Sequence, residues 1–191
     1  LNVSGLALGI ATLLTVTLFV SHEISYDRFH ERADRTFGTI GKFSFGDMRL
    51  TGNRLSAAYA PFLKGNFEKI EKTVRIGTYP ASDVYFSTVD DKKKNKETDL
   101  ALSENTIFDI FTFNILEGNP ADALSNPMTV AISKSTATKY FGESGTLGKV
   151  LKIDDKFLAT VTCVYQDFPT NSSLQYDVIL SLNSLNELEK Y

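Results

Sequence analysis

The sequence predicts an α+β protein, in which an apolar N-terminal helix leads into a mixed, mainly antiparallel α/β core domain. Residues 1–20 carry no charge, residues 21–37 are densely charged, and the rest alternates between helix-like and strand-like patterns. We therefore expect a transmembrane helix over 1–20, a stalk helix over 21–37 and a core domain over 38–191. A chain of 191 residues is long enough for one such domain, or two small ones.

The uncharged run is long enough to cross a bilayer, since a helix of this length spans about 30 Å. Gly5 and Gly9 form a GxxxG pair, and Ala11 repeats the spacing from Ala7. Small residues four apart let another helix approach closely, so we expect helix packing at Gly5, Gly9 and Ala11. Two alternatives are a signal peptide, which lacks its charged start and A-x-A site here, and a buried helix of a soluble protein.

The charged run has the spacing of an amphipathic helix. Its apolar residues recur at steps of three, four and four, which predicts a stalk-packing stripe of Tyr26, Phe29, Ala33 and Phe37. The sequence thus predicts a stiff helix from Leu1 to about Phe37. His22 and His30 lie in this run without a carboxylate or Cys set that would complete a metal site, so we expect both to be solvated or interfacial.

Later segments read as strands and short helices joined by turns. A helix is expected to start near Ala60, since Pro61 suits a first turn, and strands are expected to be interrupted at Pro80. The charged stretch at 90–99 fits a solvated hairpin tip better than a ligand patch. Gly142 is expected to end the helix KSTATKYF, and residues 154–156 to form a turn. Cys163 is expected to be a buried hydrophobe.

Catalytic signatures are absent from the sequence. It contains no GxxxxGK[ST], HExxH, GxSxG or EF-hand pattern, and it has two His and one Cys. Gly142, Gly145 and Gly148 follow a helix rather than a strand, which is wrong for a phosphate cradle. We therefore expect no enzyme, no cofactor and no metal. The net charge of −3 gives no basic field, which argues against nucleic acid as a partner.

Several stretches together carry a likeness to a known family. LNVSGLALGIA and SYDRFHERADR resemble the start of an ABC-transporter permease of the MacB-like and FtsX-like class, in the form common in Bacteroidetes. NTIFDIFTFNILEGNPADAL, ATKYFGE with LGKVL, and VYQDFPTNSSLQYDVILS follow in the same order across nearly the whole chain. The sequence departs from the family at Ser144-Gly145-Thr146, where an acidic residue and Pro are usual, and we expect this to alter only a turn.

The resemblance implies a non-enzymatic permease subunit in the bacterial inner membrane, with its main domain in the periplasm. Such domains have a porter-like part with an inserted subdomain, which the chain would contain incompletely. The implied partners are an ABC ATPase subunit that binds ATP, a second permease copy or sister permease, and membrane lipid. The permease would couple cytoplasmic ATP hydrolysis to extracytoplasmic work, as efflux or as mechanotransmission.

Another class of protein fits the same features. A membrane-anchored sensor with an extracytoplasmic ligand-binding domain would also have a membrane span and lack catalytic motifs. A secreted enzyme fits less well, because it would need a catalytic constellation that the sequence does not contain.

Overall fold

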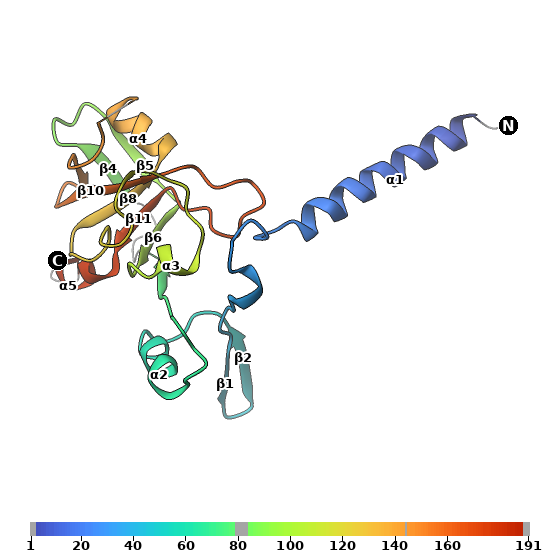
Figure 1. Ribbon diagram of the computed structural model, residues 1–191, viewed down its shortest axis with the longest axis horizontal. Coiled ribbons are helices and arrows are strands. Elements are labelled where there is room, and N and C mark those ends of the chain that lie inside the picture. Colours follow the sequence, from blue (N-terminus) through green and yellow to red (C-terminus); the bar gives the residue numbers. More distant parts are fainter. Residues whose placement is uncertain (1–2, 79–83, 144, 189–191) are drawn as a thin grey trace.

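The protein consists of a protruding helix, a large sheet-based core and a small lobe (Figure 1). A computed structural model describes residues 3–78, 84–143 and 145–188. Among the positions discussed above, Leu1, Asn2, Pro80, Ser144 and Tyr191 lie outside the described residues. Helix α1 (Val3–Ile24) projects away from the rest of the chain, and a 3-10 turn, η1 (Ala33–Arg35), follows it.

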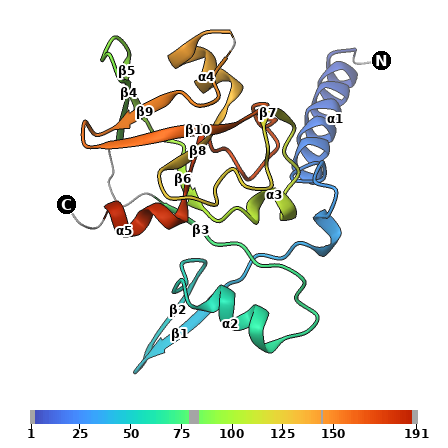
Figure 2. The same ribbon diagram turned by 60° about the vertical axis from the view of Figure 1, so that its left-hand side comes forward.

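The lobe contains a hairpin and one short helix. Strand β1 (Gly41–Phe45) pairs antiparallel with β2 (Met48–Gly52), and α2 (Tyr59–Asn66) follows. Helix α2 places Pro61 in its first turn, which confirms the expected start near Ala60. Of the side chains described between residues 37 and 72, none is buried. The described side chains of the lobe therefore form no core of their own, and the lobe lies below the sheet in both views (Figure 2).

The core is built on a nine-stranded sheet with the order β3-β6-β11-β8-β10-β9-β4-β5, and β7 also pairs with β10. The strands are β3 (Ile76–Thr78), β4 (Val84–Thr88), β5 (Lys94–Glu97), β6 (Leu100–Ser103), β7 (Ile115–Gly118), β8 (Thr129–Ser133), β9 (Val150–Ile153), β10 (Phe157–Tyr165) and β11 (Val178–Ser181). The pairings β8–β10 and β6–β11 are parallel, and the other described pairings are antiparallel. This confirms the mixed, mainly antiparallel fold class.

Both faces of the sheet are covered. Helix α4 (Lys134–Phe141) and the end of the chain, η2 (Leu182–Ser184) with α5 (Leu185–Leu188), pack on the face that carries Phe86 and Leu180. The other face packs against α3 (Ile107–Ile110) and a group of aromatic rings around Tyr165. Strands β6 and β11 are buried along their whole length, as expected for strands covered on both sides.

Several local predictions are confirmed. Gly142 caps α4 in a left-handed conformation with φ 87°, and Asp154 and Asp155 form the β9–β10 turn. The hairpin expected between DVYFSTV and TDLALS is wrong, because residues 94–97 of the charged stretch form β5 and pair with β4, whereas β6 pairs with β3 and β11. Cys163 is fully buried, and burial raises the pKa of its thiol to about 11.

Gly118 is a position where the fold requires glycine. Its φ is 93°, and an added Cβ would lie 2.3 Å from the carbonyl oxygen of Thr162. We expect Gly118→Ala to lower the free energy of unfolding by about 2 kcal/mol or more, since the left-handed conformation alone costs roughly 1–2 kcal/mol. Gly38→Ala is the control, because a Cβ there meets no atom within 4 Å. Equal thermal stability of the two variants in detergent would contradict this assignment.

Candidate functional site

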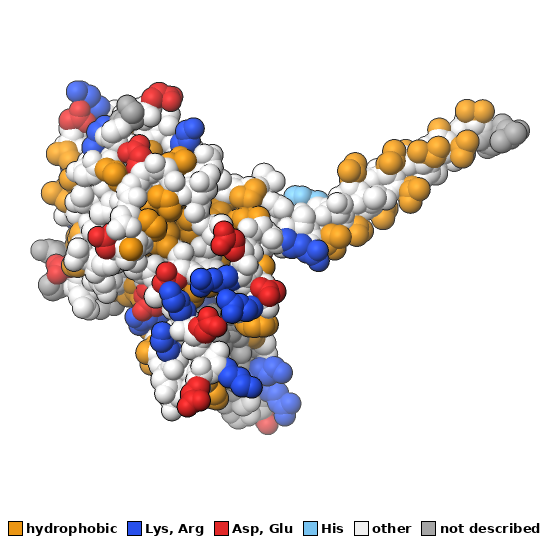
Figure 3. All heavy atoms as spheres, in the orientation of Figure 1, with side chains coloured by type: hydrophobic (Ala, Val, Ile, Leu, Met, Phe, Trp, Pro, Cys, Tyr) orange, Lys and Arg blue, Asp and Glu red, His pale blue; other side chains and the backbone are white. Residues whose placement is uncertain are grey.

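Helix α1 exposes its apolar side chains along its whole length (Figure 3). It is the one described helix long and apolar enough, by length and composition, to cross a membrane. The hydroxyls of Thr12 and Thr15 donate to the carbonyl oxygens of Leu8 and Ala11, both at 2.9 Å, so neither presents an unbonded donor to lipid. Gly5, Gly9 and Ala11 are exposed, with none of the described helices packed over them, and their packing role stays a prediction.

The predicted stalk helix over 21–37 is wrong, because α1 ends at Ile24. In a continuing helix the N–H of Asp27 would donate to Glu23, but it donates to the carbonyl oxygen of Asn171 at 3.0 Å. Asp27 has a φ of 57°, a left-handed conformation that stops a helix and that Asp tolerates better than most residues. Residues 25–32 instead form successive turns, which we call the junction.

The predicted stripe does not form either. Ala33 is exposed in η1, Phe37 is 84% exposed, and Tyr26 is 40% exposed. The ring of Phe29 packs against the core, with its centroid 6.4 Å from that of Phe168, and the Tyr26 hydroxyl donates to the carbonyl oxygen of Thr170 at 3.4 Å. A helical stripe requires a continuous helix, and the left-handed turn at Asp27 ends the helical spacing of these side chains.

Asp27 attaches the junction to the loop after β10. Its Oδ1 accepts the backbone N–H of Ser173 at 2.7 Å, and its Oδ2 accepts the hydroxyl of Ser173. The side-chain amide of Asn171 donates to Ser25, to Oγ at 2.9 Å and to the carbonyl oxygen at 3.2 Å. Bonds to an ionised carboxylate are among the stronger hydrogen bonds in proteins, so this loop holds the junction firmly.

His30 attaches the junction to a second loop, between α3 and β7. The backbone N–H of Thr112 donates to Nδ1 of His30 at 3.1 Å, and the N–H of Glu31 donates to the Thr112 hydroxyl at 2.9 Å. Arg32 adds a bond to the carbonyl oxygen of Asp109 at 3.0 Å. His22 is exposed as expected, but His30 is only 6% exposed, because its ring lies between Phe29 and Phe111. Burial lowers the pKa of His30, and the Asp27 carboxylate partly opposes this shift.

Aromatic rings continue from the junction into the core. Phe29 contacts Phe168, whose ring centroid is 5.0 Å from that of Phe113. Phe113 in turn meets the fully buried Tyr165 edge-on at 5.2 Å. These ring contacts connect the junction to strand β10, which carries Tyr165.

Sequence reasoning missed the residues that form this site, namely Asp27, His30, Thr112, Asn171 and Ser173. The signal that points to them lies in two of the stretches that carry the family likeness. SYDRFHERADR contains Asp27 and His30, and VYQDFPTNSSLQYDVILS contains Asn171 and Ser173. The structure brings these two stretches together across 146 residues.

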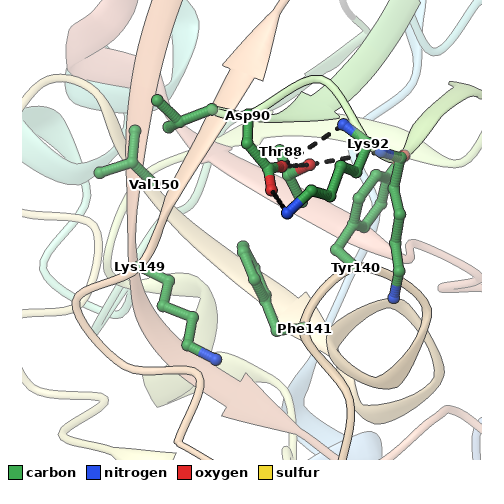
Figure 4. A pocket seen from close by; sticks show the side chains of 9 residues that line it. Thr88, Asp90, Lys92, Tyr140, Phe141, Lys149 and Val150 are labelled. Atoms are coloured by element: carbon green, nitrogen blue, oxygen red, sulfur yellow. Dashed lines mark hydrogen bonds and ion pairs between the residues drawn. The ribbon is translucent and has the colours of Figure 1, made fainter.

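An open groove of about 620 Å³ lies at the end of the sheet formed by β4 and β5 (Figure 4). The β4–β5 turn, Tyr140 and Phe141 of α4, and Lys149 and Val150 line it. The Thr88 hydroxyl and then Lys92 hold the pKa of Asp90 at about 2, so this carboxylate is unsuited to general acid catalysis. The described lining contains no nucleophile–base pair, and no group of three or more metal-ligating side chains occurs among the described residues.

Comparison with known sequences assigns this architecture to a family. A family model described as the MacB-like periplasmic core domain matches residues 1–190. The chain belongs to this family. The membership confirms the resemblance to ABC-transporter permeases of the MacB-like class. No curated protein sequence matches the chain.

Solved structures share the MacB-like fold. A domain from Porphyromonas gingivalis, assigned as part of a permease, is 29% identical, with a TM-score of 0.61 over 75% of this chain and 64% of that one. The periplasmic region of MacB from Actinobacillus actinomycetemcomitans is 15% identical, with a TM-score of 0.55 over 71% of this chain and 59% of that one. The extracellular domain of the ABC-type transporter YknZ from Gram-positive bacteria is 18% identical, with a TM-score of 0.54 over 72% of this chain and 67% of that one.

The sequence identities and the shared lengths limit what these structures show about the chain. At 15% and 18% identity, the MacB and YknZ domains show a common fold and no more. The chain spans less than two thirds of the length of the P. gingivalis and MacB structures.

The attachment by Asp27 can be tested directly. We expect Asp27→Ala to lower the free energy of local opening of residues 25–32 by about 1–2 kcal/mol, because it removes two hydrogen bonds to a charged, part-exposed acceptor. Hydrogen exchange of residues 25–32 and 170–174 would measure this opening.

Two companion variants make the result specific. Asp34→Ala removes an exposed carboxylate of η1 and should leave exchange unchanged. Asp27→Gly keeps the left-handed backbone while removing the side chain, and should open the junction as Asp27→Ala does. Full protection in Asp27→Gly would show that the backbone turn, rather than the carboxylate, holds the junction.

Proposed function

We propose that this MacB-like domain belongs to an ABC transporter permease and passes movement of α1 to the periplasmic core through the junction. The observation that carries the proposal is that no free linker separates the apolar helix from the domain. Residues 25–32 are hydrogen-bonded to two different loops, one after β10 and one before β7. Two separated attachments resist rotation about either one, so a displacement of the helix also displaces the core.

In this proposal the chain performs no chemistry itself. The sequence has no GxxxxGK[ST] loop, so ATP would be bound and hydrolysed by a partner ABC ATPase subunit. A second permease copy or a sister permease would supply the other half of the transporter, and lipid would surround α1 in the bacterial inner membrane. The work done outside the cytoplasm would be efflux or mechanotransmission.

Distances between spin labels can test the coupling in the whole permease with its ATPase, reconstituted in nanodiscs. Cys163 is fully buried, so labels can be placed at Ser21→Cys and Lys156→Cys, both exposed, without removing it. We expect the Ser21–Lys156 distance within one chain to stay constant when ATP binds, while the distance between Lys156 labels in the two halves changes. The Asp27→Ala variant should broaden the first distance and reduce the ATP-driven change in the second.

Two other results would contradict the proposal. Movement of the two halves that persists undiminished when Asp27→Ala has loosened the junction would contradict coupling through this site. Movement driven by an added extracytoplasmic ligand, with no response to ATP, would favour the membrane-anchored sensor.

Phe29 provides a second test, because its ring packs between His30 and Phe168. We expect Phe29→Asp to leave membrane insertion and ATP hydrolysis intact while abolishing most transport, since a carboxylate there cannot pack against rings. Phe37→Asp is a matched control at an 84% exposed position and should transport normally. Normal transport by Phe29→Asp in reconstituted vesicles would show that this contact is dispensable.

A further inference from the structure

The ring of His30 holds a polar atom that the described contacts leave unsatisfied. Nε2 is buried and has no hydrogen-bond partner among the described residues. The Oδ1 atom of Asp27 lies 3.9 Å from it, which is too far for a hydrogen bond. Buried polar atoms in folded proteins are nearly always bonded, so an orphaned ring nitrogen inside an attachment point calls for a physical explanation.

Hydrogen bonding fixes which ring nitrogen carries the hydrogen. Nδ1 accepts the N–H of Thr112, so it must present its lone pair to that donor. In a neutral imidazole the hydrogen is then on Nε2, the nitrogen nearer Asp27. The attachment of the junction to the α3–β7 loop therefore requires the neutral ring.

Protonation would remove this attachment. The added proton has to bind Nδ1, because Nε2 already carries a hydrogen, and both nitrogens of the charged ring are donors. Two donors, Nδ1–H and the N–H of Thr112, would then face each other at the position of the present 3.1 Å bond. The charged ring would also be drawn toward Asp27, where its Nε2–H would compete with the N–H of Ser173 for Oδ1.

Charged groups on each element packed against the ring have described partners. On the junction itself, Asp27 faces Nε2, and Arg32 is bonded to the carbonyl oxygen of Asp109. On the α3 side, the Asp109 carboxylate pairs with Lys72 at 2.9 Å. On the loop after β10, Asp167 accepts the N–H of Ser135 on α4. Asp27 is thus the one carboxylate that has a described ion contact with the ring.

We propose that the junction is an acid-released latch, in which protonation of His30 at Nδ1 breaks its bond to Thr112 and loosens α1 from the core. The proposal rests on the function proposed above and adds a regulation of the same site. Mild acid outside the cytoplasm would then uncouple the helix from the domain without unfolding the sheet.

The direction of the pH response follows from the burial of the ring. Burial lowers the pKa of His30 in the attached state, with the Asp27 carboxylate partly opposing it, whereas a released ring regains its ordinary pKa of about 6.5. The released state therefore binds the proton more tightly. The contribution of His30 to attachment is complete above that ordinary value and is lost as the pH falls through it toward the lowered one.

The Ser21–Lys156 label pair can measure the latch in the reconstituted permease with its ATPase. We expect the fraction of released junctions to rise severalfold between about pH 7.5 and about pH 5, the range in which histidine changes charge. His30→Asn keeps an acceptor near the position of Nδ1 and cannot titrate, so its distance distribution should not change with pH. His22→Asn removes the other, exposed histidine and should respond like the unmodified protein.

A second measurement covers the case in which His30→Asn does not fold. Solid-state NMR of ¹⁵N-histidine, read as the difference on acidification, should show a ring nitrogen that is unprotonated at neutral pH gaining a proton as the Thr112 amide loses its exchange protection. The latch is wrong if the ring titrates without loss of that protection, or if His30→Asn responds to pH as the unmodified protein does.

Failure of the latch can be separated from failure of the proposed function. ATP-driven movement at about pH 7.5, with no added effect of acid, would leave the coupling in place and overturn only the latch. Absence of ATP-driven movement at both pH values would contradict the coupling itself.

Discussion

The carboxylate of Asp27 joins two parts of this protein whose surfaces differ sharply. On one side is a helix of 22 residues with no buried side chain, suited to lipid, and on the other is a sheet covered on both faces. Asp27 accepts two hydrogen bonds from Ser173, which lies 146 residues away. Its left-handed backbone also turns the chain so that His30 can reach the second loop. Packing of Phe29 on the core depends on the same turn.

The junction combines strong hydrogen bonds and ring packing with one bond that the proposed latch makes dependent on pH. Charge-assisted bonds at Asp27 and ring packing through Phe113 to Tyr165 make the attachment stiff. In the proposed latch, the buried His30 makes the attachment dependent on pH, because its bond to Thr112 requires the neutral ring. A continuous helix would transmit movement at all times, whereas a turn held by side chains can be released. MacB-like domains belong to transporter permeases, so under the proposed function this difference would decide whether movement reaches the core.

Local sequence patterns correctly predicted the features of the fold that depend on local interactions. The apolar span, the cap at Gly142, the turn at Asp154-Asp155 and the burial of Cys163 all depend on neighbours in sequence or on plain hydrophobicity. The prediction of a stalk helix was wrong because apolar residues at steps of three and four give information on spacing alone. They cannot reveal that the N–H of Asp27 finds the carbonyl of Asn171 instead of that of Glu23. The expectation of a solvated or interfacial His30 failed for the same reason, since Phe111 and Thr112 approach it from a distant segment.

The sequence by itself determined the membrane-compatible helix, the α+β class and, through stretches in a shared order, the family. These follow from composition, periodicity and residue identity, which are one-dimensional properties. Tertiary structure alone decided that two of those stretches touch, that the helix stops at Ile24, and that the site is a hydrogen-bonded turn. The physical reason is that a carboxylate or an imidazole can bond any donor of suitable geometry, and only the folded chain places Ser173 and Thr112 within reach.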